Sequence, residues 1–287
     1  MTSDGKKKLS ASQQQAYRER GYHYPVRVFG ASETEKFRGH FQDYLSRNRE
    51  RISGLPPREH YIVMTQTHLL LRWVFQMVSH PKVLDAVESV LGPNLMVWSS
   101  QWFPKMPGDK TYISWHQDAT YWGLRPPNVT TAWIALSESC PENGCMRVIP
   151  GSQDGPLLPQ METYAQDNAL SRGQEIAVAV EESRAVDLVL QPGEMSLHHI
   201  GIVHGSNANK SEKPRIGLAV RFITPEVVQD GDARPIVLLV RGKDEFGHFD
   251  VVDPPQDDVI SSQATELHQE ALRRQRTNIM PKGSKRP

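Results

Sequence analysis

The chain has 287 residues, enough for one large domain or two small ones with a substantial buried core. Its 33 basic and 33 acidic residues cancel, so no global field favours nucleic acid or anionic lipid, and we expect neither as a partner. Only two cysteines occur, which excludes a thiolate zinc cluster, and no apolar run of about 18 residues predicts a membrane span. We therefore expect a cytoplasmic protein whose partner is a small-molecule substrate.

The first part of the chain, about residues 10–92, predicts helices. Ser32 and Glu35 have the spacing of a capping box, and apolar residues follow at helical intervals. A run that begins at His68 is apolar enough for one buried helix, and Pro81 suits the first position of the next. These helices are expected to flank the rest of the fold.

From about residue 93 to 225, short β-type runs divided by Pro, Gly and Asn replace the helical patterns. Seven or more such strands, without helical patterns between them, favour a sandwich or barrel over a parallel α/β sheet. We predict a mostly β fold with flanking helices and a jelly-roll core. The whole chain, residues 1–287, is predicted to form a single domain.

Two parts of the chain are less regular. Residues 150–186 form a long connection of the kind that is usually functional or disordered, and polar groups in it, among them Arg172, could face either a substrate or solvent. The C-terminal extension, residues 226–287, holds one helical pattern over 261–274, which we expect on the outside of the domain. Its basic end, 273–287, is expected to fray.

His116 and Asp118 lie two residues apart, so on a strand their side chains would leave the same face and converge. The pair alone is weak evidence for a metal, and a third ligand is required. His204, which ends a later β-type run, completes two imidazoles and one carboxylate, a set that holds Fe(II) on one face and leaves three positions open. His198 shares the parity of His204 in an unbroken strand, so parity alone does not exclude it.

Arg215 stands eleven residues after His204, at the start of the next apolar run. A guanidinium forks onto a carboxylate through two hydrogen bonds, so Arg215 could bind the far end of a dicarboxylic co-substrate, and Ser206 could add a hydroxyl. Taken alone, Arg215 would read as a surface arginine. The His-Gly-Ser context of His204 and the step to Arg215 favour His204 over His198 as the ligand.

The motifs HQDATYW, VTTAWIAL, ENGCMRVIPGS and HGSNANKSEKPR, within about residues 90–225, resemble the phytanoyl-CoA dioxygenase (PhyH) family of Fe(II)/2-oxoglutarate-dependent oxygenases. The resemblance implies a double-stranded β-helix, a cupin-like jelly roll. It also implies that Fe(II) is bound by His116, Asp118 and His204, and that Arg215 with Ser206 holds the distal carboxylate of 2-oxoglutarate. Gln101 and Trp133 match further cofactor-contacting positions.

The activity that the resemblance implies is hydroxylation of a C–H bond of a small or medium-sized metabolite by O2, with succinate and CO2 as co-products. Halogenating relatives lack the metal carboxylate, whereas Asp118 is present, which favours hydroxylation. Gln153 stands where the family often has a histidine, which affects the neighbouring loop rather than the ligands. The alternatives are another oxidation at the same site (desaturation, cyclisation or demethylation) and a non-catalytic cupin-like metal-binding protein, which would have no need of Arg215.

Four residues are candidate substrate contacts. Tyr121 and Trp122 follow the ligand pair and could form a substrate wall, or they could be ordinary core. His68 could face the site from the N-terminal layer, although a satisfied core histidine is the simpler interpretation. Arg172 is the fourth candidate, from the long connection.

Overall fold

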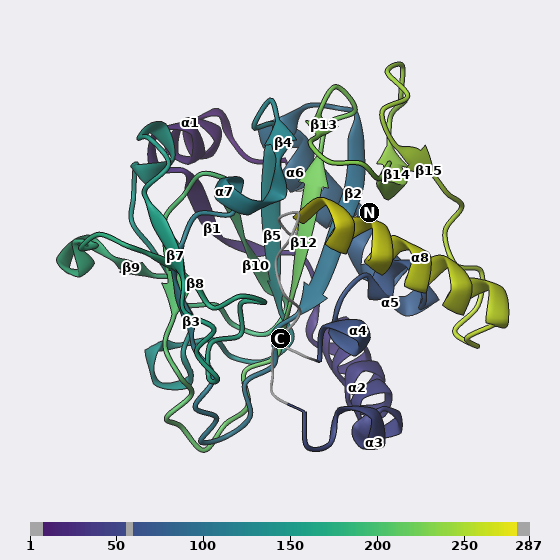
Figure 1. The fold of residues 1–287 in the computed structure, drawn as a ribbon, viewed down its shortest axis with the longest axis horizontal. Coiled ribbons are helices and arrows are strands. Elements are labelled where there is room, and N and C mark those ends of the chain that lie inside the picture. Colours follow the sequence, from purple (N-terminus) through teal and green to yellow (C-terminus); the bar gives the residue numbers. More distant parts are fainter. Residues whose placement is uncertain (1–7, 56–59, 280–287) are drawn as a thin grey trace, which may run out of the picture.

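The computed structural model describes residues 8–55 and 60–279, and its centre is a pair of facing β-sheets (Figure 1). The large sheet is mixed and has seven strands, in the order β1 (Tyr22–Arg27), β10 (Glu194–His199), β5 (Val129–Ala135), β12 (Gly217–Ile223), β2 (Leu95–Trp102), β14 (Ile236–Arg241) and β15 (Asp250–Val251). The small sheet has the order β3 (Ile113–His116), β11 (His204–Ser206), β6 (Met146–Val148) and β9 (Val186–Asp187). The predicted jelly roll is confirmed.

Helices contribute the apolar core on the outer face of the large sheet. They are α1 (Ala11–Arg20), α2 (Ala31–Arg47), α4 (Tyr61–Met64), α5 (Arg72–Val78) and α6 (Pro81–Leu91), with a 3₁₀ turn at Thr67–Leu69, and the short α3 (Arg49–Ile52) follows α2. Alternation along β12 separates the two faces: Leu218, Val220 and Phe222 join the apolar core under the helices, whereas Ala219 and Arg221 face the cavity between the sheets. The outer face of the large sheet therefore packs against an apolar core, and its inner face lines the cavity.

Two details of the N-terminal helices differ from the sequence-based prediction. Helix α2 begins after Gly30, whose backbone N–H donates to the Glu33 carboxylate at 3.1 Å, so the capping box predicted at Ser32 and Glu35 is wrong. The apolar run at His68 is also not one helix, because Leu71 is extended and separates the 3₁₀ turn from α5. The start of α6 at Pro81 is confirmed.

The run from residue 194 to 204, predicted as one strand, is divided between the two sheets. Strand β10 ends at His199, a turn closes with the N–H of Ile202 donating to the His199 carbonyl at 3.1 Å, and β11 begins at His204 in the small sheet. The parity argument that linked His198 to His204 therefore fails. The two histidines approach each other from opposite sheets.

The long connection contains a 3₁₀ turn at Ser152–Asp154, the paired strands β7 (Gln160–Glu162) and β8 (Gln174–Ile176), and a second 3₁₀ turn near its end. Asn168, Arg172 and Gln174 are buried in it rather than exposed to solvent. Another short ladder pairs β4 (Leu124–Arg125) with β13 (Val228–Gln229), close to the short helix α7 (Ala119–Trp122). Further 3₁₀ turns lie at Pro141–Asn143 and Glu182–Arg184.

The C-terminal helix α8 (Ser262–Ile279), yellow in Figure 1, corrects one prediction. It extends through the segment predicted to fray, as far as the described residues reach; 280–287 lie outside them. The helix packs on the outside of the domain, and its inner face reaches the cavity, because Gln275 donates to Ser99 of β2 at 3.0 Å and Leu272 lines the cavity.

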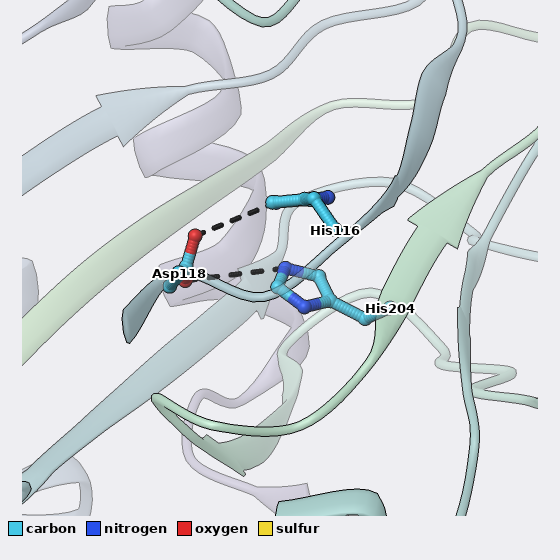
Figure 2. Close-up of side chains that lie close together, drawn as sticks. All are labelled: His116, Asp118 and His204. Atoms are coloured by element: carbon cyan, nitrogen blue, oxygen red, sulfur yellow. Dashed lines mark ion pairs between the residues drawn. The ribbon is translucent and has the colours of Figure 1, made fainter. Parts of the chain in front are cut away.

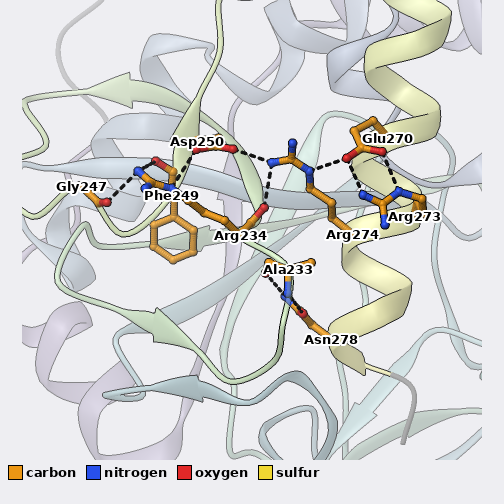
Figure 3. A network of polar contacts seen from close by, with 9 residues as sticks. All are labelled: Ala233, Arg234, Gly247, Phe249, Asp250, Glu270, Arg273, Arg274 and Asn278. Carbon is orange, nitrogen blue, oxygen red and sulfur yellow. Dashed lines mark hydrogen bonds and ion pairs between the residues drawn. The ribbon is translucent and has the colours of Figure 1, made fainter. Parts of the chain in front are cut away.

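Polar contacts fix α8 against the end of the large sheet (Figure 3). Arg274 donates to Glu270 in its own helix at 2.7 Å and to Asp250 of β15, and it reaches the carbonyl of Arg234 at 3.0 Å. Asn278 exchanges hydrogen bonds with the backbone of Ala233. Among the described residues, no helix combines the length and the apolar character needed to cross a membrane.

Candidate metal centre

Three predicted ligands meet between the sheets (Figure 2). His116 ends β3 and lies opposite His204 of β11 in the ladder, while Asp118 begins the turn into α7. His116 Nε2 is 3.4 Å from Asp118 Oδ1, and His204 Nε2 is 3.9 Å from Asp118 Oδ2. Ligand atoms of all three residues lie within 4.8 Å of one another, an arrangement that can hold one metal ion.

Backbone hydrogen bonds orient both imidazoles. His116 Nδ1 lies 2.9 Å from the Ser114 carbonyl oxygen, and His204 Nδ1 lies 3.1 Å from that of Ile202. A carbonyl oxygen only accepts, so in each ring Nδ1 carries the proton and Nε2 presents its lone pair. The lone pairs therefore point toward Asp118, as metal ligation requires.

The electrostatics keep the carboxylate charged and His204 neutral. Burial opposes ionisation of Asp118, but the polar surroundings formed by His116, His204 and Arg221 outweigh it and lower the pKa of Asp118 to about 2. Burial, reinforced by His116, lowers the pKa of His204 to about 4. One anionic oxygen and two neutral nitrogens, without thiolate, are a donor set that fits Fe(II) and leaves open positions.

The ligands open onto a cavity of about 890 Å³ between the sheets, whose outer wall is completed by α2, α3 and α8. Of the other predicted residues, six line it: Gln101, Tyr121, Trp122, Trp133, Ser206 and Arg215. Two do not. His68 is fully buried and bonds to Ser100 Oγ at 2.8 Å, as a core histidine would, and Arg172 lies behind the wall, paired with Glu162 and set against the Tyr121 ring.

Several contacts fix Arg215 in the wall of the cavity. Its side chain is buried, its guanidinium lies 5.3 Å from the ring of Trp133, and it donates to the carbonyls of Gly144 and Phe103. Its Nε has no hydrogen-bond partner among the described residues. A cation held in this way presents remaining donor capacity to an anion in the cavity.

Lys105 is a residue that the sequence analysis missed. It is only 2% exposed, its backbone pairs with that of Arg215, and its Nζ donates to Ser206 Oγ at 2.7 Å. Burial, with the nearby charge of Arg215, lowers the pKa of Lys105 to about 6. No local signal marks it, because a lysine between Pro104 and Met106 in a polar loop resembles a surface residue.

Arg221 was missed as well, although a signal existed. It is a charged residue inside the apolar run GLAVRFI, at even spacing from Arg215, and the structure buries it facing the cavity. His198, also in the cavity wall, lies beside His204 with ring centroids 4.9 Å apart.

A jelly roll that presents two histidines and one aspartate to a cavity between its sheets, with a buried arginine in the wall of the same cavity, defines the class: this is an Fe(II)- and 2-oxoglutarate-dependent oxygenase. The family model for phytanoyl-CoA dioxygenase (PhyH) matches residues 17–217. The chain belongs to that family.

Known relatives agree with the class and differ in their named substrates. The chain is 27% identical to the peroxisomal phytanoyl-CoA dioxygenase of Bos taurus, over 85% of this chain and 79% of the relative. It is 26% identical to a probable alpha-ketoglutarate-dependent hypophosphite dioxygenase of Stutzerimonas stutzeri, over 75% and 78%. Among solved structures, the non-heme monooxygenase ThoJ in its apo form is 32% identical, with a TM-score of 0.80 over 93% of this chain and 97% of that chain.

Proposed function

We propose that this enzyme hydroxylates a C–H bond of a small or medium-sized metabolite, with His116, Asp118 and His204 holding Fe(II). The observation that carries the proposal is that the open side of this triad and the guanidinium of Arg215 share one cavity. A metal-binding protein without turnover would not need a buried cation in the wall of the same pocket.

The predicted cofactor-binding residues each have a role in this proposal. Bound Fe(II) and 2-oxoglutarate supply the oxidising chemistry, in which one oxygen atom of O2 enters the substrate and the other enters succinate as CO2 leaves. Arg215 and Ser206 bind the distal carboxylate of 2-oxoglutarate, and Trp133 holds the guanidinium in place. Gln101 lines the cavity nearby and contributes to the orientation of the co-substrate.

Tyr121 and Trp122 form the substrate wall in this proposal. Trp122 packs on Trp98 with ring centroids 5.2 Å apart, and the Tyr121 ring rests on Arg172, so both are supported from behind. Helix α8 closes the outer side and limits access of water. Asp118 supplies the third protein ligand, so no coordination position is opened for a halide by a missing carboxylate. This favours hydroxylation over halogenation.

Two further expectations belong to the proposal. Residues 1–287 act as one domain, since β1 and β14, from the parts that flank the predicted core, pair with β10 and β2 of the large sheet. The cytoplasm is the compartment predicted from the sequence, whereas the Bos taurus relative is named peroxisomal. Fractionation of cells that produce the full chain distinguishes the two compartments.

The test is succinate formation by the purified full chain with Fe(II), 2-oxoglutarate and O2, alone and with a metabolite library. We expect slow succinate release alone, a faster one with the substrate, and a product heavier by one oxygen atom. Asp118→Ala should remove both rates, and Arg125→Gln, at an exposed surface position, should leave them unchanged. A wild-type protein that binds Fe(II) and 2-oxoglutarate but never releases succinate would contradict the proposal.

A further inference from the structure

Four polar residues form one row across the inner face of the large sheet. His198 of β10 lies opposite Thr131 of β5, Thr131 lies opposite Arg221 of β12, and Arg221 lies opposite Ser99 of β2. All four side chains line the cavity, and each residue is at most 8% exposed. We call these four residues the polar row.

Three of the four side chains in the polar row carry a buried polar atom that has no hydrogen-bond partner among the described residues. His198 Nδ1, Thr131 Oγ1 and Arg221 Nε are buried without a hydrogen bond to any described residue, whereas Ser99 Oγ accepts from Gln275. Buried polar atoms are normally satisfied, because leaving one unpaired costs about 1–3 kcal/mol. Three such atoms from adjacent strands point to a ligand that the row is built to receive.

Arg221 gives the row its charge. Its guanidinium contacts two aromatic rings, with its carbon 5.3 Å from the centroid of Trp122 and 5.7 Å from that of Phe103. Its one recorded hydrogen bond is a long one, 3.4 Å from Nη2 to Gln101 Oε1. Among the residues that the structure describes, no carboxylate lies within ion-pair distance of it, although the charge of Asp118 acts on it, and its Nε has no hydrogen-bond partner.

The row is distinct from the place assigned to 2-oxoglutarate. Arg221 follows Arg215 by six residues along an extended segment, so their Cα atoms are roughly 20 Å apart. Their guanidinium groups meet different parts of Phe103: that of Arg215 donates to its carbonyl, and that of Arg221 lies over its ring. The charges of a divalent ion, Asp118, Arg215 and a 2-oxoglutarate dianion sum to zero, so the guanidinium of Arg221 adds one positive charge to this set of buried groups.

We propose that the polar row is the specificity-determining subsite for the primary substrate and binds a carboxylate of that substrate beside the metal. Arg221 donates two hydrogen bonds to the carboxylate. The hydroxyl of Thr131 and the imidazole N–H of His198 donate further hydrogen bonds to its two oxygens. Since His198 adjoins His204, the carboxylate would place the neighbouring carbons of the substrate against the open side of the triad. This inference rests on the proposed function and names the class of substrate, a carboxylic acid.

The test compares a carboxylate with its neutral amide. Hydrocinnamate and hydrocinnamamide share an aromatic end that suits the wall of Trp98 and Trp122 and differ only in charge. Their Kd values are measured by ligand-observed NMR on the Co(II)-loaded enzyme under saturating 2-oxoglutarate without O2, where Co(II) also enhances the relaxation of probe protons near the metal. We expect the wild type to bind hydrocinnamate at least about tenfold more tightly than the amide, with strong relaxation enhancement.

The variants separate a binding role from a structural one. Arg221→Gln should abolish the preference for the carboxylate, Arg221→Lys should retain part of it, and Thr131→Val should weaken it less than Arg221→Gln does. Arg147→Gln is the matched control, because Arg147 also stacks on an aromatic ring, Trp115, but lies outside the cavity lining. A wild type without the preference, or an Arg221→Gln variant that keeps it, overturns the inference.

Two arms distinguish this inference from the function on which it rests. Titration of 2-oxoglutarate into the Co(II) enzyme should give the same Kd for the wild type and Arg221→Gln; an equal loss for co-substrate and hydrocinnamate would assign Arg221 to the co-substrate and overturn the inference. A wild type that binds no 2-oxoglutarate counts against the proposed function instead. The same pair of probes, titrated with Co(II) alone, then still decides whether Arg221 selects a carboxylate.

Discussion

His204 lies directly opposite His116 in the antiparallel ladder between β11 and β3, with ring centroids 4.1 Å apart. The register of two short strands therefore determines whether two of the three ligands meet, because a slip by one residue would turn His204 to the other face. We expect His204→Ala to weaken Co(II) binding by more than the roughly 10- to 100-fold loss typical of outer-shell partners. Calorimetric titration checks this, and His199→Ala, at a residue that ends β10, is the control that should bind Co(II) normally.

Arg215 should govern the affinity for 2-oxoglutarate and leave the metal untouched. Replacing it with Gln removes the charge-assisted fork, and we expect KM for 2-oxoglutarate to rise about 10- to 100-fold while the Kd for Co(II) stays constant. Arg215→Lys should recover only part of the affinity, since an ammonium cannot form two parallel bonds. An unchanged KM in the Gln variant would remove Arg215 from the co-substrate site.

Gly217 leaves room for Trp133. A Cβ at this position would lie 2.2 Å from the indole, which in turn supports Arg215. We expect Gly217→Ala to destabilise the fold by about 1–3 kcal/mol and to weaken 2-oxoglutarate binding, with a changed tryptophan emission. Gly39→Ala is the matched control, because nothing lies within 4 Å of its added methyl group and its helix should gain stability. Equal effects of the two substitutions would contradict this account.

Helix α8, which lines the cavity, should become more mobile when its polar contacts with the large sheet are removed. Arg274, partly buried, joins the helix to Asp250 and the Arg234 carbonyl, whereas Arg273 is exposed and pairs only with Glu270 of the same helix among the described residues (Figure 3). We expect Arg274→Met to raise the hydrogen-exchange rate of α8 amides well above that of Arg273→Met, since exposed pairs contribute only about 0.2–1 kcal/mol. Identical exchange in the two variants would show that the apolar face of α8 anchors it alone.

His68 should make the apoprotein sensitive to acid. Burial, with the charge of His268, lowers the pKa of His68 to about 3. The unfolded chain takes up this proton near pH 6.5, so the contribution to stability is complete above that pH and is lost as the pH falls toward 3, at up to about 1.4 kcal/mol per pH unit. Urea unfolding with a chelator present, over a pH series, should give a shallower slope for His68→Asn than for the wild type.

The sequence predicted the ligands better than their surroundings. His116 and Asp118 share a local spacing and His204 has a recognisable context, so neighbouring residues were sufficient. The burial of Lys105 and the alignment of the polar row depend on pairing between strands that are distant in sequence, which no local pattern reports, although the apolar run around Arg221 marked that residue by itself. The start of α2 was missed for the opposite reason: two overlapping four-residue patterns have the capping spacing, and only the backbone at Gly30 decides between them.

The division of the run from 194 to 204 between the sheets has a mechanical consequence. His116 and His204 belong to the small sheet, whereas Trp133 and Arg221 belong to the large one and Arg215 leads into it. Together, a bound metal ion and a bound diacid therefore connect the small sheet to the large sheet. Each of the two binds more readily once the other has fixed the relative position of the sheets. The increase in thermal stability with both ligands bound should therefore exceed the sum of the increases with each ligand alone, because both ligands stabilise the same interface between the sheets.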